Sequence, residues 1–265
     1  MSYLKQLYAD QSALPHATLP AVPLQNAPTF ARPHHSFSWQ RLVLLALFCG
    51  LVLIVSLYAG QRHYLLTSFL LMGGAFGAVC LRFERRHPTA RELVVIAVLI
   101  ALAVAGRSAF FMLAQFKPVA AVVIISGVAF GGDVGFLVGA MSALTSNIFF
   151  TQGPWTPWQM LAFGCVGYLA GLLSWAKLLP PKRLPLCLFG FLSVFLIYGG
   201  IMNPAAIIMY GGSLNKLALL GAYVAGAPMD LVHAFATFLF LGVLGLPMLR
   251  QLARLQLKYG LFAEN

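Results

Sequence analysis

The residues best suited to chemistry lie in the segment 146–160, which reads SNIFFTQGPWTPWQM between two apolar runs. A loop that only joined two helices would need a few polar or glycine residues. This one holds the amides Asn147 and Gln152 and the tryptophans Trp155 and Trp158. Two prolines stiffen its backbone, and each indole offers a flat face with one N–H donor. The segment therefore predicts a rigid, partly apolar lid over a ligand at a membrane surface, with an interfacial aromatic belt as the alternative.

Further polar side chains stand at the predicted outer ends of other apolar runs. Arg107 closes one run, Lys117 opens the next, and Asn203 ends another. Ionisable groups at the rim of a membrane span by default mark a functional site or a buried polar pair. We expect these side chains to line a cavity rimmed by two phenylalanines and the two tryptophans, which suits a ring system carrying amides or an acidic group. The predicted substrate-binding residues are Arg107, Phe110, Phe111, Lys117, Asn147, Gln152, Trp155, Trp158, Asn203, Asp230 and His233.

Asp230 and His233 are spaced i and i+3 in GAPMDLVHAFATF, so their side chains share one face of a helix. We expect Pro228 to fix the entry of the last span, with Asp230 capping its N-terminus and orienting His233 toward the cavity. Two alternatives stay open. One is a purely structural pair, and the other is a proton relay in a secondary carrier, which predicts inverted internal repeats that are not convincing here.

Catalytic signatures are missing from the sequence. The chain has no GxxxxGK[ST] phosphate loop, no HExxH and no GxSxG, and its six acidic residues are too few for a paired acid–base or dimetal site. The four cysteines lie singly inside apolar runs without CxxC spacing, which indicates packing rather than a disulfide framework. We therefore expect no enzymatic activity, no catalytic residues, no cofactor and no metal site.

Composition assigns the chain to the membrane. Of its 265 residues 60% are hydrophobic and only 9% charged, with a mean hydropathy of +0.87. Repeated apolar runs of about 20 residues are typical of helices that cross a bilayer, so the predicted fold is an all-α polytopic membrane protein with about eight spans. The predicted spans are 41–60, 64–81, 92–106, 118–132, 135–150, 158–176, 184–203 and 229–249. The net charge of +11 comes from basic residues that punctuate these spans, so it does not indicate nucleic-acid binding.

The segment 204–228 is apolar but interrupted by glycine and polar residues. We predict an irregular outer loop with a short interfacial or re-entrant helix there, with a ninth span as the alternative.

With eight spans and a cytoplasmic N-terminus, all but four of the 17 basic residues fall inside, as the positive-inside rule requires, and both termini are cytoplasmic. The four outside are Arg62, Arg107, Lys117 and Lys216.

Three parts of the chain follow from these patterns. Residues 1–38 are rich in proline and lack a periodic apolar face, so we expect a flexible cytoplasmic tail rather than a signal peptide. Residues 39–81 form a two-helix N-terminal membrane extension. The arginine-rich stretch RFERRHPTAR opens the third part, 82–265, which we expect to be a six-helix substrate-binding core with a cytoplasmic C-terminal tail.

Small residues recur every four positions in several core spans. Gly131, Gly135 and Gly139 share one helix face, and Gly167 and Gly171 share another. This spacing lets a second helix backbone approach closely, and we expect these stripes to pack within the chain. A third stripe, AxxxAxxxA in AVLIALAVAGR, either packs internally or docks another subunit.

The stretch GRSAFFMLAQFKPVAAVV through GPWTPWQM, with the later APMDLVHAFATFLF, resembles the substrate-binding S component of energy-coupling-factor (ECF) vitamin transporters. More narrowly it resembles a branch with two extra N-terminal helices that is tied to cobalamin-type substrates. The resemblance covers 82–250. It implies a subunit of the bacterial plasma membrane that binds a vitamin from outside and topples against a transmembrane coupling subunit driven by two ATPases. The family's AxxxA docking motif maps onto Ala97, Ala101 and Ala105.

Three functions remain open after these arguments. The first is the vitamin-capturing S component, with cobalamin or a related corrinoid as the favoured substrate and a flavin, thiamine or queuosine precursor as smaller candidates. The second is the proton-coupled secondary carrier that uses Asp230 and His233. The third is a scaffold or enzyme subunit of the bilayer that transports nothing.

Overall fold

The fold is given by a computed structural model, which describes residues 88–210 and 215–262 together with scattered positions between 70 and 84. The predicted tail and the two predicted N-terminal spans otherwise lie outside the described residues. Every regular element in the described part is a helix, and η marks a π-helical turn. The elements are α4 Ala90–Ala109, α5 Val119–Phe130, α6 Gly132–Phe150, α7 Thr156–Trp175, α8 Arg183–Ser193, η3 Val194–Tyr198, α9 Gly199–Met209, α10 Lys216–Phe240, η4 Leu241–Gly245 and α11 Leu246–Tyr259.

Among the described residues, five helical rods are long and apolar enough to cross a membrane, as judged by length and composition. They are α4, α6, α7, the continuous run Arg183–Met209 and the continuous run Lys216–Tyr259, and α5 is a shorter apolar helix. These six elements correspond to the six predicted core spans. The prediction of an all-α polytopic membrane protein is therefore confirmed.

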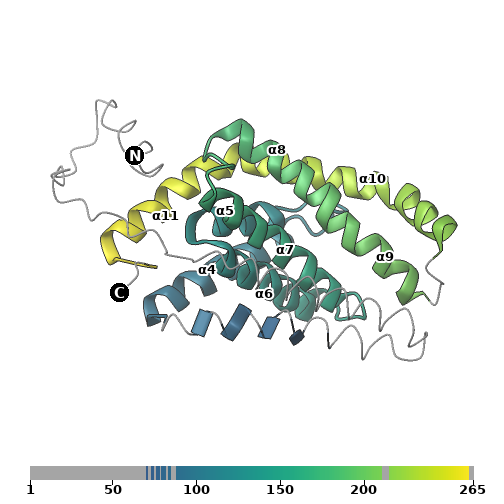
Figure 1. Cartoon of the computed structure of the whole chain (residues 1–265), viewed down its shortest axis with the longest axis horizontal. Helices are drawn as coiled ribbons and strands as arrows, with labels where there is room; N and C mark the ends of the chain where they lie inside the picture. The colour runs from purple at the N-terminus through teal and green to yellow at the C-terminus, as the bar shows by residue number, and fades with distance from the viewer. Residues whose placement is uncertain are drawn as a thin grey trace.

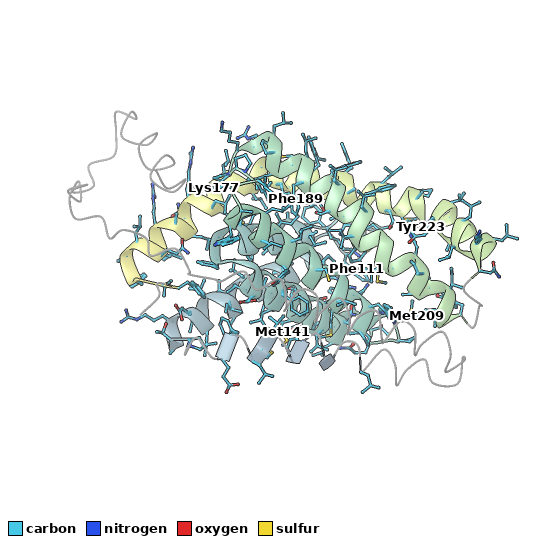
Figure 2. All side chains as sticks on the ribbon, viewed as in Figure 1. Phe111, Met141, Lys177, Phe189, Met209 and Tyr223 are labelled. Carbon is cyan, nitrogen blue, oxygen red and sulfur yellow. The ribbon has the colours of Figure 1, made fainter. Side chains whose placement is uncertain are left out.

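The rods are arranged in two groups (Figure 1). Helices α4 to α7 pack against one another, and the two long rods α8–α9 and α10–α11 run beside them and against each other. The chain reverses direction at each connection. The loops 110–118 and 151–155, the last turn of α9 and the first turn of α10 therefore share one end of the bundle. We call this the 151–155 end. Figure 2 shows Met209 near this end and Lys177, which follows α7, near the opposite end.

Helices α5, α6 and α7 approach one another to backbone contact through glycines. A Cβ atom on Gly135 in α6 would overlap the carbonyl oxygen of Gly167 in α7 and lie 2.7 Å from the Cα of Gly127 in α5. A Cβ atom on Gly139 would lie 2.6 Å from the carbonyl carbon of Phe163. Real Cβ atoms essentially never come so close to backbone atoms. The predicted packing within the chain is confirmed for Gly135, Gly139, Gly167 and Gly171, whereas Gly131 lies between α5 and α6 and a Cβ atom there would meet nothing within 4 Å.

A proline inside α9 is compensated by a side chain of the neighbouring helix. Pro204 has no N–H group to donate to the carbonyl of Gly200, one turn earlier. The Tyr223 hydroxyl of α10 donates to that carbonyl oxygen at 3.1 Å. The lost backbone hydrogen bond is thus replaced by one that holds α9 to α10.

The structure corrects the prediction for the segment 204–228. Helix α9 continues to Met209, and α10 begins at Lys216, so residues 216–228 form the first turns of the last rod. They are neither an irregular loop nor a separate ninth span.

The helix passes through Pro228, which lies inside α10. The side chain of Asn215 caps the earlier start by accepting a hydrogen bond from the Ala218 backbone N–H at 2.8 Å. A proline removes one helical hydrogen bond, whereas an irregular loop in an apolar environment would leave many backbone groups unpaired. Continuing the helix is the smaller cost, which explains why the proline does not end it.

The opposite end of the bundle is closed by the C-terminal helix. Thr89 and Glu92 form a capping box at the start of α4, and the Glu92 carboxylate also accepts a hydrogen bond from the Phe262 backbone N–H. Gln256 of α11 donates to the Ala129 carbonyl of α5 at 3.0 Å. These contacts tie α11 to the helices of the first group.

The glycine contact gives a first prediction. Gly135→Ala is expected to lower the free energy of unfolding by about 1–3 kcal/mol, because the added methyl group overpacks a backbone contact. Thermal unfolding of the purified protein in detergent measures the loss. The matched control is Gly221→Ala in α10, where a Cβ atom would meet nothing within 4 Å. That variant is expected to be neutral or stabilised by up to about 1 kcal/mol, and equal losses in both variants would contradict the contact.

Candidate functional site

Arg107, in the last turn of α4, anchors a buried polar network. Its Nη1 donates to Ser146 Oγ at 2.6 Å and to Asn147 Oδ1 at 2.8 Å, both in the last turn of α6. The Phe150 ring lies 5.3 Å from the guanidinium carbon, which adds a cation–π contact. Ser146 and Asn147 are fully buried. The structure therefore brings together two of the predicted residues, Arg107 and Asn147, through direct hydrogen bonds.

Asn147 extends this network to α7 and η3. Its Nδ2 donates to Thr156 Oγ1 at 2.9 Å and to Gln159 Oε1 at 2.8 Å. Gln159 is in turn hydrogen-bonded to the Tyr198 side chain. The result is a hydrogen-bonded chain from α4 through α6 and α7 to η3. The sequence analysis missed Ser146, Thr156, Gln159 and Tyr198, although an amide inside the predicted span 158–176 was a signal that could have identified Gln159.

Three rings meet beside the Tyr198 end of this network. The His233 ring lies edge-on to Tyr198, with centroids 4.8 Å apart, and 5.9 Å from Phe163. Tyr198 and Phe163 are themselves 4.6 Å apart. His233 is only 3% exposed, and its Nδ1 has no hydrogen-bond partner in the described structure. A buried polar atom left without a partner costs about 1–3 kcal/mol, so this nitrogen is a candidate ligand contact.

Asp230 does not cap the last helix, contrary to the sequence prediction. It lies well inside α10, because that helix begins much earlier than predicted. Its Oδ2 accepts a hydrogen bond from Asn203 Nδ2 at 2.7 Å. Glycines make room for the pair: a Cβ atom on Gly199 would lie 2.7 Å from Asp230 Oδ2, and one on Gly226 would lie 2.9 Å from Asn203 Cγ. Asn203 and Asp230 thus form a polar contact between α9 and α10.

The loop between α4 and α5 folds toward the second group of helices. Phe110 and Phe116 both pack against Phe240 of α10, with ring centroids 5.1 and 5.4 Å apart. Phe111 stacks on Phe150 of α6 at 5.0 Å, although it remains 56% exposed. Of the two predicted rim phenylalanines, Phe110 therefore faces the bundle and Phe111 lies at its surface.

Lys117 ends this loop just before α5 and is half-buried. Burial lowers the pKa of Lys117 below its usual value, and the positive charge of Arg107 adds to the effect. Both cations also lie within electrostatic range of His233. The hydrogen-bonded network links Arg107 to Tyr198, whose ring contacts His233, so these residues, which are far apart in the sequence, belong to one site with Lys117 in the loop beside it.

Trp155 and Gln152 occupy the loop before α7. Trp155 is the N-cap residue of α7, is half-buried, and lies with its ring against Gly153. Gln152 is exposed, accepts a hydrogen bond from Thr156 Oγ1 at 2.8 Å, and thereby connects to the buried network. The role of both residues as a lid over a ligand stays a prediction.

Trp158 lies inside α7 and is buried. It packs with Ala205 of α9, next to Ile201 and Met202. Trp158 is therefore a packing residue between two helices in this structure, and a role in ligand binding stays a prediction.

The alanine stripe lies on the outside of the bundle. Ala97, Ala101 and Ala105 are all exposed, and they line an apolar groove of about 450 Å³ between α4 and α6. Thr145 and Phe149 form the α6 side of the groove. A row of small side chains on an exposed helix face permits close approach by another helix.

Potential metal ligands do not gather in the described part of the chain, where no group of three or more His, Cys, Asp or Glu could hold an ion. The groups that do gather are amides, hydroxyls and two cations beside aromatic rings. Such a set has the chemistry to hydrogen-bond and stack on an organic ring with polar substituents.

The positions of the two tryptophans generate a second prediction. Trp158→Ala is expected to lower the free energy of unfolding by about 3–5 kcal/mol, because it leaves a cavity between α7 and α9. Trp155→Ala, which removes a half-exposed ring, is expected to cost about 1 kcal/mol or less. Thermal unfolding in detergent compares the two variants. Equal stability of both variants would show that Trp158 is not a packing residue.

Known proteins resemble this chain over a large part of its length. Residues 88–254 match the family model described as "ECF-type riboflavin transporter, S component". A UPF0397 protein of Aliivibrio salmonicida is 31% identical over 151 residues, which cover 55% of this chain and 78% of the relative. A UPF0397 protein of Vibrio atlanticus is 32% identical over 122 residues, which cover 43% and 66%. No solved structure matches the chain.

The family match extends over more than half of the chain and includes α4 to α10 with their entire polar network. Together with the apolar rods, it identifies a multi-pass membrane protein that serves as a transporter component rather than an enzyme. The chain belongs to the ECF-type riboflavin transporter, S component family.

Proposed function

We propose that this chain is the membrane-embedded capture subunit of an ATP-driven vitamin importer. It binds its vitamin from outside at the 151–155 end and then docks to a transmembrane coupling subunit, while two partner ATPases hydrolyse ATP. Membership of the S component family supports the substrate-binding role and the association with such partners in general. The absence of a phosphate loop from the sequence agrees with hydrolysis elsewhere. In this proposal the protein lies in a bacterial plasma membrane with both termini in the cytoplasm.

The observation that carries the proposal is the buried polar network from Arg107 to Tyr198 and the unpaired His233 nitrogen beside it. Polar and ionisable groups inside a membrane bundle are expensive and by default mark a functional site. A purely structural bundle would gain more from apolar packing at these positions. The network lies near the 151–155 end, beneath the loops that contain Trp155 and Phe110.

The substrate we favour is a planar vitamin of flavin size. The family description names riboflavin. The rings of Tyr198, Phe163 and Phe110 offer flat apolar contacts, and the half-buried amide of Gln159 offers a hydrogen bond to a polar ring edge. A corrinoid such as cobalamin, which the sequence resemblance implies, is the second candidate. Its larger ring would require the loop between α4 and α5 to move away from Phe240.

Mass spectrometry of small molecules released from the purified full-length protein tests this substrate. We expect a flavin in near-stoichiometric amount. Recovery of a corrinoid in that amount would show that the substrate is of the cobalamin class rather than a flavin. Recovery of thiamine or a queuosine precursor would contradict both substrate proposals. Uptake that collapses with the proton gradient at constant ATP would favour the proton-coupled carrier that uses Asp230 and His233.

The exposed alanine groove generates a third prediction. Ala101→Trp is expected to abolish uptake, because the indole fills the groove and keeps another helix from close contact. Ligand binding by the isolated protein should stay within about twofold, since the groove is on the outside of the bundle. The matched control is Val98→Trp, which replaces an exposed side chain about 60° around α4 from Ala101 and outside the groove lining.

Uptake by cells that carry the coupling subunits and ligand binding by the purified protein are measured for both variants. Val98→Trp is expected to keep both activities. If Ala101→Trp loses binding together with uptake, the stripe supports the fold and does not dock a partner.

A further inference from the structure

Arg107 and Lys117 are the two cations of the site formed by the Arg107–Tyr198 network and His233, which we call the interior site. Neither cation has a carboxylate partner among the described residues. Arg107 donates to the neutral oxygens of Ser146 and Asn147 and contacts the Phe150 ring. Neither Arg107 nor Lys117 forms an ion pair within the described part of the chain. The two positive charges also lie within electrostatic range of each other, so they repel.

The acidic residues of the described chain do not balance this charge. Glu92 and Asp133 lie at the starts of α4 and α6, roughly 20 Å along the helices from the 151–155 end, and Glu84 precedes both. Asp230 lies nearer, but its carboxylate is hydrogen-bonded to Asn203. The hydrogen bond from the neutral Asn203 amide does not change the charge of Asp230, so the interior site contains two cations and one carboxylate and has a net positive charge.

A third polar group at the same place also lacks a partner. His233 Nδ1 is buried and unpaired among the described residues, within electrostatic range of both cations. Unpaired charges and polar atoms inside a membrane bundle are destabilising. A ligand that supplies negatively charged oxygen atoms would satisfy all three groups at once, and each charge-assisted hydrogen bond is stronger than a neutral one.

We propose that the ligand of this S component carries an acidic group, a phosphate or a carboxylate, which Lys117 and Arg107 bind while the ring packs beside Tyr198 and His233. This inference rests on the proposed vitamin-binding function. It narrows the substrate from a planar vitamin to an anionic one.

Two matched ligand pairs test the inference by calorimetric titration of the purified full-length protein. Flavin mononucleotide differs from riboflavin by one phosphate group, and cobinamide phosphate differs from cobinamide by one phosphate group. In one of the pairs, the member with the phosphate is expected to bind at least about tenfold more tightly. Equal or tighter binding of the neutral member overturns the inference but leaves vitamin capture intact. The thermal transition of the protein shows whether it is folded. If a folded protein binds none of the four ligands, both the proposed substrates and this inference are wrong.

A charge variant locates the acidic group. Lys117→Gln is expected to weaken binding of the phosphate-bearing member about tenfold and that of the neutral member less than threefold. Lys117→Arg keeps the charge and should retain the preference. The control Lys216→Gln removes an exposed cation at the same end of the bundle and should change neither affinity. Equal loss for both members of the pair in Lys117→Gln would overturn the assignment, because the lysine would then act on the fold rather than on the ligand's charge.

Discussion

Backbone contact between α5, α6 and α7 is the constraint on which the rest of the structure depends. Apolar side chains gain little by leaving lipid for a protein interior, so helices in a bilayer associate through close packing. Gly127, Gly135 and Gly167 allow that approach at one point where three helices meet. The contact fixes how α6 lies on α7, and therefore holds Asn147 within hydrogen-bond distance of Gln159, about two to three turns along the two helices.

The site is built across the two groups of helices rather than within either one. Helices α4, α6 and α7 contribute the hydrogen-bonded network, whereas η3 and α10 contribute Tyr198 and His233. The two halves meet through the Gln159–Tyr198 hydrogen bond and the contacts of Phe163 with both rings. A ligand bound at this junction would contact both groups, so its binding energy favours the relative arrangement that it fits best.

The sequence predicted the features that depend on local patterns. Apolar runs gave the helical rods, four-residue spacing gave the glycine contacts, and polar residues at helix ends indicated Arg107 and Asn147. The sequence prediction was wrong where a rule derived from soluble proteins was applied to a helix in an apolar environment. Pro228 was expected to start a helix, but unpaired backbone groups in lipid cost more free energy than one lost hydrogen bond. That error also misplaced Asp230 as a cap. The pairing of Gln159 with Tyr198 joins residues that no local pattern connects, so only the fold reveals it.

The last rod has a mechanical consequence. Lys216–Tyr259 forms 44 residues of continuous helix, roughly 66 Å at 1.5 Å per residue, whereas the hydrocarbon layer is about 30 Å thick. One half contains Asp230 and His233, and the other ends where Arg91 lies over the Tyr259 ring at the start of α4. The rod therefore connects the site residues to the start of α4. Any change of its tilt that a ligand caused near His233 would also act on the contact of Tyr259 with Arg91, at the base of the helix that holds the alanine groove.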